Sequence, residues 1–297
     1  MDTPDVIIVG AGPAGIATAI QLKRYGIKYL LFEQKEIGGL LKNANSVENY
    51  PGFANGIRGS NLIKRFEKQL TNIGVGVNFE KVIELEYENG TFLAKTNRKI
   101  FKSAIAVIAT GTKPKTLPYS PLPDNVDNRI FYEIYPIRKT KNKTIAIIGA
   151  GDAAFDYAFG LSRKNKVVIL NRSKQIKCLP LLWSRCMKSE NVSYSDNTDL
   201  KKIDYHNKQL ELTYVDKTGQ NEKQIRVDYV VVAVGRVPQL DFLGKRLKKN
   251  LENLIKSNKL FMIGDVKNKI YRQTAISVGD GVKAAMKIHR KLKKGNG

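Results

Sequence analysis

Apolar residues in this chain come in short, unbroken runs. Residues 5–9 form one such run and residues 144–148 form another, and each leads directly into a glycine. Runs of this length that end at a turn signal are typical of strands buried on both faces of a parallel sheet. The pattern therefore predicts a buried strand and a tight turn in two separate parts of the chain.

A complete strand–helix–strand unit begins at the first run. The glycine-rich residues 10–15 follow it as a G-x-G-x-x-G turn, then a helical stretch at 13–25 and a second apolar run at 28–33. In such a turn the first glycine makes the bend, the second lets a pyrophosphate approach, and the third lets the helix pack on the strand. The pyrophosphate lies at the helix N-terminus, where free N–H groups favour anions. Glu33, 18 residues after Gly15, is expected to bind ribose hydroxyls.

The same order repeats later in the chain. The strand at 144–148 leads into residues 149–154, a G-x-G-x-x-A turn, and then into a predicted helix to about residue 163 and a strand at 166–171. Alanine at the last position of the turn still lets the helix pack closely. Two such units predict an α/β fold with two dinucleotide-binding domains, one nested inside the other.

Segments of alternating polarity follow each unit and predict antiparallel hairpins. They occupy residues 77–88 with 91–95, and 210–215 with 224–227. The expected division is 1–112 and 237–297 for the outer domain and 113–236 for the inner domain.

The two units differ at the position of the ribose-binding acid. Asn171 stands there in the second unit, and Arg172 and Lys174 follow it. A carboxylate would repel a 2′-phosphate, whereas asparagine beside two cations accommodates one. This difference favours NADPH over NADH, with ordinary surface cations as the competing interpretation.

The composition is that of a folded protein. Of 297 residues, 42% are hydrophobic and 26% are charged, which excludes fibrous and disordered chains. There is no apolar run long enough to span a bilayer and no signal-peptide pattern, so the cytoplasm is the expected compartment. Two cysteines and two histidines argue against a disulfide framework or a metal site. The chemistry is therefore expected to come from an organic cofactor.

The net charge of +24 favours acidic partners such as nucleic acid, anionic membranes, acidic proteins or phosphorylated ligands. Lysine and arginine are spread along the whole chain, and the only dense run is 283–294, where six of twelve residues are cationic. No nucleic-acid-binding motif accompanies the charge, so nucleic acid is not the expected partner. A general bias towards lysine is the alternative explanation.

Beyond the glycine turns, five segments resemble the low-molecular-weight thioredoxin reductase family of two-domain flavoproteins. Residues 37–40 and 48–53 are similar to its flavin-side signature, 109–111 and 264–266 to its FAD contacts, and 271–281 to its closing motif. The resemblance covers nearly the whole chain. It implies two Rossmann-like, three-layer ββα domains, with the NAD(P)H-binding domain inserted in the FAD-binding domain, and it implies a homodimer.

The motifs and the resemblance together assign residues to both cofactors. By resemblance, Asp265 bonds the ribityl chain, and backbone N–H groups at 272–274 face the flavin N1–O2 edge and stabilise reduced flavin. The residues expected to bind FAD are Gly10, Gly12, Pro13, Ala14, Gly15, Glu33, Gln34, Gly39, Leu40, Asn49, Val82, Thr110, Gly111, Asp265, Arg272, Gln273 and Thr274. Those expected to bind NAD(P)H are Gly149, Gly151, Asp152, Ala153, Ala154, Asn171, Arg172, Lys174, Gly235 and Arg236.

The chain departs from the family at the redox-active thiols. Family members that reduce thioredoxin carry Cys-x-x-Cys shortly before the second glycine turn, and Tyr132 and Tyr135 stand at those positions here. Electrons are therefore expected to leave directly from the flavin, with no side chain acting as a nucleophile. The resemblance then points to the ferredoxin–NADP reductases of this fold, with ferredoxin or flavodoxin as the acidic electron acceptor.

Two other functions also fit the sequence. One is a disulfide reductase that uses Cys178 and Cys186 or a divergent route to thioredoxin-like partners. The other is a flavin-binding protein whose nicotinamide site has decayed, for which Asn171 and the tyrosines are the support.

The chain also lacks the C-terminal extension that covers the flavin in some ferredoxin reductases. In addition, a lysine-rich, helix-like segment at 245–259 stands where the family usually has a further hairpin.

Overall fold

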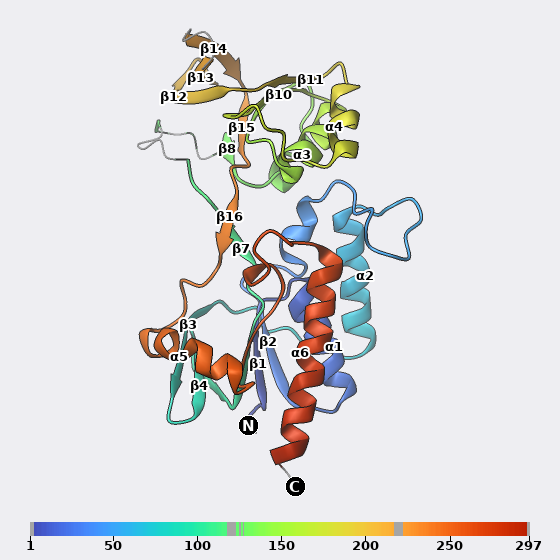
Figure 1. Cartoon of the computed structure of the whole chain (residues 1–297), viewed down its shortest axis with the longest axis vertical. Coiled ribbons are helices and arrows are strands. Elements are labelled where there is room, and N and C mark those ends of the chain that lie inside the picture. Colours follow the sequence, from blue (N-terminus) through green and yellow to red (C-terminus); the bar gives the residue numbers. More distant parts are fainter. Residues whose placement is uncertain (1–2, 118–122, 125, 127, 217–221, 296–297) are drawn as a thin grey trace. The chain divides into compact units, whose positions relative to one another are not determined.

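The computed structural model describes residues 3–117, 123–124, 126, 128–216 and 222–295, and these form two compact units (Figure 1). Unit 1 comprises Met1–Lys42, Val47–Lys113 and Val237–Gly297, and unit 2 comprises Asn43–Ser46 and Pro114–Arg236. Apart from the short segment Asn43–Ser46, the main chain leaves unit 1 after Lys113 and returns to it at Val237, which is the nested arrangement that the repeated motif predicts.

Unit 1 is built on a four-stranded parallel sheet in the order β17-β6-β1-β2. The strands are β1 (Val6–Val9), β2 (Tyr29–Phe32), β6 (Ile105–Ile108) and β17 (Leu260–Met262). Every residue of β1 and β6 is buried, because layers cover both faces of the sheet. This explains why both strands are unbroken apolar runs in the sequence.

One face of this sheet carries helices and the other carries a smaller sheet (Figure 1). The helical layer contains α1 (Pro13–Arg24), α2 (Gly59–Asn72) and α6 (Thr274–Gly295). The opposite layer contains β3 (Val82–Glu88), β4 (Thr91–Thr96) and β5 (Ile100–Ser103), with α5 (Lys245–Lys256) packed on β3. Leu247 and Leu254 form the buried side of α5, whereas its lysines face outward.

Unit 2 repeats this plan around a five-stranded parallel sheet in the order β11-β10-β9-β15-β8. The strands are β8 (Ile130–Phe131), β9 (Thr144–Ile148), β10 (Lys166–Leu170), β11 (Val192–Ser195) and β15 (Tyr229–Val232). Helices α3 (Asp152–Ser162) and α4 (Pro180–Met187) cover one face. The antiparallel sheet of β12 (Thr198–His206), β13 (Gln209–Asp216) and β14 (Glu222–Val227) lies on the other.

Most of the elements expected from the sequence are confirmed. Both strand–turn–helix–strand repeats are present, both hairpins form, and the lysine-rich segment at 245–259 is helical over Lys245–Lys256. The last helix begins at Thr274, so residues 271–273 precede it. The sequence did not indicate that the two crossovers, β7 (Thr112–Pro114) and β16 (Arg236–Pro238), pair as strands. Within the described residues, no helix combines the length and hydropathy that a bilayer crossing requires.

Candidate functional site

The first glycine turn leaves an open space at the N-terminus of α1. Gly10 has φ +105°, and a Cβ there would lie 2.5 Å from the carbonyl oxygen of Ala109. A Cβ on Gly15 would lie 1.9 Å from the carbonyl oxygen of Gly10. On Gly12, however, a Cβ would meet no protein atom within 4 Å. The outer two glycines therefore serve the fold, and the middle one leaves room for a ligand.

The helix end beside this space is suited to an anion. Gly12 precedes α1 without a side-chain cap, and the first turn of the helix carries no acidic residue. The backbone N–H groups of that turn and the positive end of the helix dipole are thus offered to the space over Gly12. The geometry fits the pyrophosphate of FAD.

Several of the predicted FAD residues gather at this turn. One carboxylate oxygen of Glu33 accepts a hydrogen bond from the N–H of Ala11 at 2.9 Å. Gly39 lies against Gly12, since a Cβ on Gly39 would be 3.7 Å from the Gly12 Cα. Thr110 adjoins Gly10 and donates its hydroxyl hydrogen to the carbonyl oxygen of Gln239 at 2.7 Å. Segments far apart in sequence therefore surround one backbone turn.

The loop that carries Asp265 is held against the same turn. A Cβ on Gly264, which has φ +69°, would lie 2.9 Å from the Cβ of Ala14. The hydroxyl of Ser277 in α6 donates to the Asp265 carboxylate at 3.3 Å. Asp280, also in α6, accepts hydrogen bonds from the N–H of Gly264 at 3.1 Å and from the side-chain amide of Asn268 at 2.7 Å. Helix α6 thereby positions the predicted ribityl ligand.

The charge of Asp280 suits this anchoring role. Burial alone would raise the pKa of Asp280, but the hydrogen bonds from Asn268 and the Gly264 N–H, together with the Lys267 ammonium group, lower it below its ordinary value. Asp280 is therefore an acceptor throughout the neutral range. The motif at 271–281 contains this residue, but no pattern in the sequence indicates that Asp280 anchors the loop.

The remaining predicted FAD residues are more dispersed. Asn49 donates its side-chain amide hydrogen to the Gln273 side chain at 2.9 Å, which brings two of them together. Gln34 is exposed directly after Glu33, whereas Val82 is buried in the hydrophobic core of unit 1. Other predicted contacts lie in the turns and helix starts of unit 1, namely Pro13, Leu40, Gly111, Arg272 and Thr274.

The second glycine turn, in unit 2, reproduces the geometry of the first. Gly149 has φ +119°, and a Cβ there would lie 2.4 Å from the carbonyl oxygen of Ala233. A Cβ on Gly151 would again meet nothing within 4 Å. Ala154 is fully buried where α3 packs on the sheet, so alanine fits in place of the third glycine. Unit 2 thus offers a second space for a dinucleotide phosphate at a helix N-terminus.

Asn171, at the position of the ribose-binding acid, forms side-chain hydrogen bonds within unit 2. Its side-chain amide is buried and donates to the Tyr194 hydroxyl at 2.9 Å and to the Gln175 carbonyl at 3.2 Å. The amide therefore holds the turn after β10. Arg172 and Lys174 are exposed on that turn, which presents their cationic groups beside the strand end.

Lys177 lies beside the second glycine turn, although the sequence did not predict it there. It forms a β-bridge with Gly151, and its N–H donates to the carbonyl oxygen of Ala150 at 3.4 Å. The predicted site residue Asp152 fixes the same loop, because its carboxylate accepts a hydrogen bond from the N–H of Leu179 at 2.8 Å. The chain after Lys174 thus returns to the glycine turn. In the sequence, the only indication of this return was Lys177 itself, the third cation in the segment 172–177.

The segment that contains Tyr132 and Tyr135 borders an ionic network within unit 2. Glu133 forms an ion pair with Arg236 and accepts a hydrogen bond from the hydroxyl of Tyr157. Burial, with the nearby Glu133 carboxylate, raises the pKa of Tyr157 well above its ordinary value. Tyr135 carries the Arg138 guanidinium over its ring at 3.4 Å from the centroid. The side chains in and around the segment of Tyr132 and Tyr135 are therefore polar and aromatic.

Cys186, in α4, belongs to the hydrophobic core of unit 2, and the partly buried Cys178 packs against that core. Cys186 is fully buried and directs its thiol to the carbonyl oxygen of Phe155 at 3.2 Å. Burial raises the pKa of Cys186 to about 11, and burial likewise raises the pKa of Cys178. A protonated, buried thiol is a poor nucleophile. The described residues also contain no group of three or more His, Cys, Asp or Glu side chains that could hold a metal ion.

Comparisons with known proteins agree with this geometry. The chain matches the pyridine nucleotide-disulphide oxidoreductase family over residues 4–281. A thioredoxin reductase of Borreliella burgdorferi is 30% identical over 309 residues, which cover 97% of this chain and 92% of that protein. A Clostridium pasteurianum protein, described as a 34.2 kDa protein in a rubredoxin operon, is 26% identical over 297 residues and 95% of each chain.

A solved structure extends the agreement to the fold. Thioredoxin reductase from T. acidophilum superposes with a TM-score of 0.86 at 27% identity, over 98% of this chain and 99% of that one. The two glycine turns, the two parallel sheets and the family match are therefore consistent with one fold and one family. The chain belongs to the pyridine nucleotide-disulphide oxidoreductase family and is a flavin-dependent NAD(P)H oxidoreductase with the thioredoxin reductase-like fold.

Proposed function

We propose that this protein is an NADPH oxidoreductase whose bound flavin delivers electrons directly to a separate carrier protein, without a thiol relay. The observation that carries the proposal is the chemistry of the segment before β9. Tyrosines occupy positions 132 and 135, and the two cysteines of the chain lie elsewhere, at 178 and 186. A dithiol relay needs an accessible thiolate, which a core thiol with a raised pKa does not supply.

Unit 1 is the proposed FAD domain. The N–H groups at the start of α1 would hold the pyrophosphate, Glu33 the adenosine ribose and Asp265 the ribityl chain. When bound, FAD supplies the redox chemistry, accepting hydride from a nicotinamide and releasing electrons to the acceptor. The N–H groups of Gln273 and Thr274 would offer hydrogen bonds to the negative edge of the reduced ring, whereas the Arg272 N–H donates to the carbonyl oxygen of Ile270 at 3.1 Å.

Unit 2 is the proposed NADPH domain. Its open space at Gly151 suits the pyrophosphate, and the exposed cations Arg172, Lys174 and Lys177 lie on the loop that returns to this turn. Hydrogen bonds to charged groups contribute about 1.5–3 kcal/mol each. The loss of Arg172 and Lys174 should therefore raise the KM for NADPH by roughly tenfold or more and leave the KM for NADH within about twofold.

An acidic electron carrier is the proposed acceptor. The net charge of +24 favours encounter with a negatively charged protein. The relative from Clostridium pasteurianum lies in a rubredoxin operon, and this supports a small redox protein as the partner class. Ferredoxin and flavodoxin are the first candidates.

A steady-state panel tests the proposal. The holoprotein is assayed with NADPH and with NADH against ferredoxin, flavodoxin, rubredoxin and thioredoxin as acceptors. We expect NADPH-dependent reduction of at least one electron carrier and none of thioredoxin. Thioredoxin reduction at a rate equal to that of the carriers would overturn the proposal.

Two sets of variants sharpen the panel. Cys178→Ser with Cys186→Ser should leave carrier reduction unchanged, and a loss of activity without a loss of folding would favour the rival disulfide reductase.

Arg172→Gln with Lys174→Gln tests the nucleotide preference, with Lys188→Gln as an exposed cation outside the loop for comparison. Equal KM values for NADPH in the parent and the double variant would contradict the assigned 2′-phosphate site. Failure to bind either nicotinamide in calorimetry would support a decayed site.

A further inference from the structure

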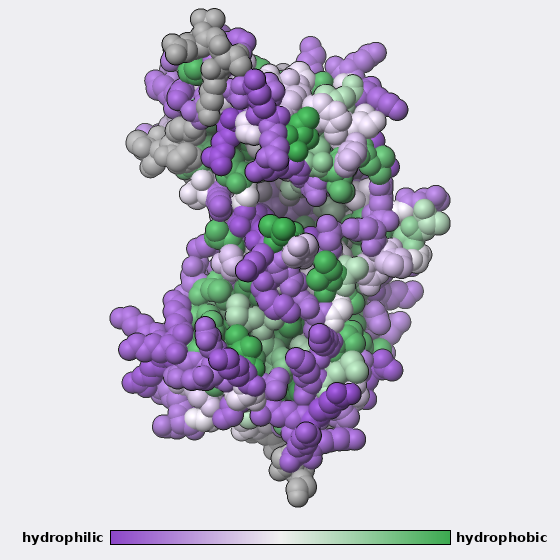
Figure 2. Space-filling model, in the orientation of Figure 1, coloured by the Kyte–Doolittle hydropathy of each residue, from purple (hydrophilic) through white to green (hydrophobic). Residues whose placement is uncertain are grey.

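A groove in unit 1 is lined almost entirely by cations. Its volume is about 550 Å³, and its lining residues are Asn258, Lys287, Arg290, Lys291 and Lys294. Four of the five carry a positive charge, and none is acidic. Figure 2 shows hydrophilic side chains covering much of the surface at the end of unit 1 that carries α5 and the C-terminal half of α6.

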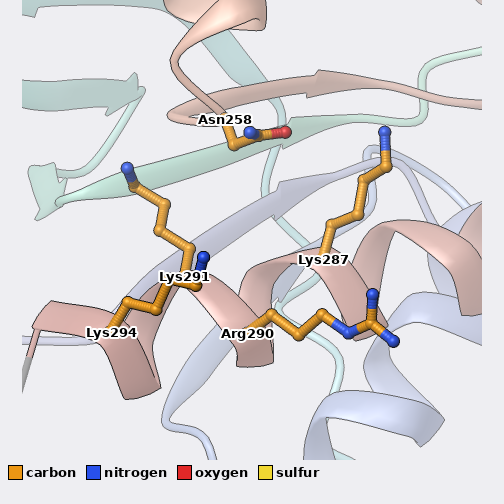
Figure 3. Close-up of a pocket in the computed structure, with 5 residues that line it drawn as sticks. All are labelled: Asn258, Lys287, Arg290, Lys291 and Lys294. Carbon is orange, nitrogen blue, oxygen red and sulfur yellow. The ribbon is translucent and has the colours of Figure 1, made fainter.

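Helix periodicity places these cations together. Their positions follow the i, i+3, i+4, i+7 spacing of one helix face, while Ala284, Ala285 and Ile288 form the buried face of α6. Figure 3 shows Lys287 and Lys291 extending from α6 on either side of Asn258, which belongs to the turn between α5 and β17. That turn is fixed, because the Lys291 ammonium group donates to the carbonyl oxygen of Ser257 at 3.0 Å. The groove therefore has two walls.

The arrangement holds like charges close together at an electrostatic cost. Like charges on neighbouring helix turns repel each other. Among the residues that the structure describes, no carboxylate pairs with Lys287, Arg290 or Lys294. A bound anion with several charges would remove this repulsion and receive several charge-assisted hydrogen bonds at once.

The groove is separate from the predicted flavin site. The flavin-side residues stand at the start of α6, near Thr274, whereas the groove begins 13 residues later at Lys287. At 1.5 Å per residue, the cations lie about 20–30 Å along the helix from Thr274. The groove therefore does not serve hydride transfer, and the following inference does not depend on the proposed function.

We propose that this groove binds a small soluble ligand with two or more adjacent phosphate groups. The volume lies in the range of ordinary ligand pockets, about 300–1,000 Å³. Lysine ammonium groups and one guanidinium suit phosphate oxygens, and the Asn258 amide adds a neutral donor and acceptor. A concave, two-walled site favours a compact oligophosphate over a flat membrane surface.

Calorimetry with sodium tripolyphosphate tests this site. The holoprotein is first saturated with NADP⁺, so that the nucleotide turn of unit 2 does not contribute, and is titrated at physiological ionic strength. We expect one saturable site, with orthophosphate binding at least about tenfold more weakly because it offers fewer charged contacts. An unsaturable titration, or equal affinity for the two anions, would overturn the proposal.

A matched pair of variants separates the groove from the general surface charge. Lys287→Gln with Arg290→Gln should weaken tripolyphosphate binding at least about tenfold. Lys248→Gln with Lys249→Gln removes the same charge from the exposed face of α5 and should change the affinity less than about twofold. Equal weakening by both pairs would mean that only the overall field attracts the anion. If the first pair fails to fold, the exposed single variant Lys294→Gln replaces it under the same criteria.

Two further arms distinguish other sources of phosphate. The holoprotein should not sediment with vesicles containing phosphatidylglycerol, and single-stranded oligonucleotides should not displace tripolyphosphate. Vesicle binding that needs Lys287 and Arg290, in the absence of tripolyphosphate binding, would overturn the proposal in favour of a membrane contact. Displacement by an oligonucleotide would overturn it in favour of nucleic acid.

Discussion

Two glycines of the first turn are needed for different reasons: Gly15 for the packing of the fold and Gly12 for ligand binding. Substitutions can separate the two effects. A Cβ at Gly15 would lie 1.9 Å from backbone, whereas a Cβ at Gly12 would meet no protein atom within 4 Å. We expect Gly12→Ala to lower FAD affinity at least about tenfold and to cost the apoprotein no more than about 1 kcal/mol of unfolding free energy. Gly15→Ala should destabilise the apoprotein itself by several times that amount. Flavin fluorescence titration and urea unfolding measure the two effects, and similar unfolding curves for both variants would contradict this division.

The buried thiol of Cys186 makes stability depend on pH in the alkaline range. Burial raises its pKa from 9.0 to about 11, so the folded state keeps a proton that the unfolded state releases. The contribution is fully present below about pH 9 and is lost as the pH rises through about 11. We expect the unfolding free energy of the parent protein to fall more steeply over this window than that of Cys186→Ala. Urea unfolding at several pH values measures this dependence. Equal slopes of unfolding free energy against pH for the parent protein and Cys186→Ala would refute the prediction.

Local patterns in the sequence predicted the helices, strands and turns whose formation depends on neighbouring residues. Buried strands, glycine turns and amphipathic helices each follow from a local pattern, so both dinucleotide-binding units could be recognised. Contacts between distant segments could not. The hydrogen bonds of the Asn171 side chain depend on Tyr194, and the position of Lys177 depends on a bridge to Gly151. The sequence therefore predicted Asn171 as a nucleotide contact but not its hydrogen bonds within the turn after β10.

The link between α6 and the loop of Asp265 can be tested through Asp280. Asp280→Ala removes the acceptor for the Gly264 N–H, Asn268 and Lys267, which should cost about 1–3 kcal/mol of unfolding free energy and weaken FAD binding. Since the pKa of Asp280 lies below its ordinary value of 3.8, its contribution is present above that pH and is lost as the pH falls through the lowered pKa.

A surface carboxylate provides the control for Asp280. Asp241 forms an exposed ion pair with Lys113, so Asp241→Ala should change the unfolding free energy by less than about 0.5 kcal/mol. Chemical unfolding of both variants at pH 7 and pH 3 gives the comparison. An Asp280→Ala variant as stable as Asp241→Ala at pH 7 would show that α6 does not hold the loop.

The net charge of +24 should govern the rate at which the protein encounters an acidic carrier. Attraction between charged proteins raises association rates by roughly 10–1,000-fold at low ionic strength, and salt screens it because the Debye length shrinks to about 10 Å at 0.1 M. We therefore expect kcat/KM for ferredoxin or flavodoxin to fall at least about tenfold between roughly 0.02 and 0.3 M salt. With an uncharged quinone as acceptor, the same change in salt should have little effect, because no long-range attraction operates. Identical salt profiles for the two acceptors would mean that the positive surface does not steer the carrier, and the charge would then need another explanation, such as the cationic groove of α6.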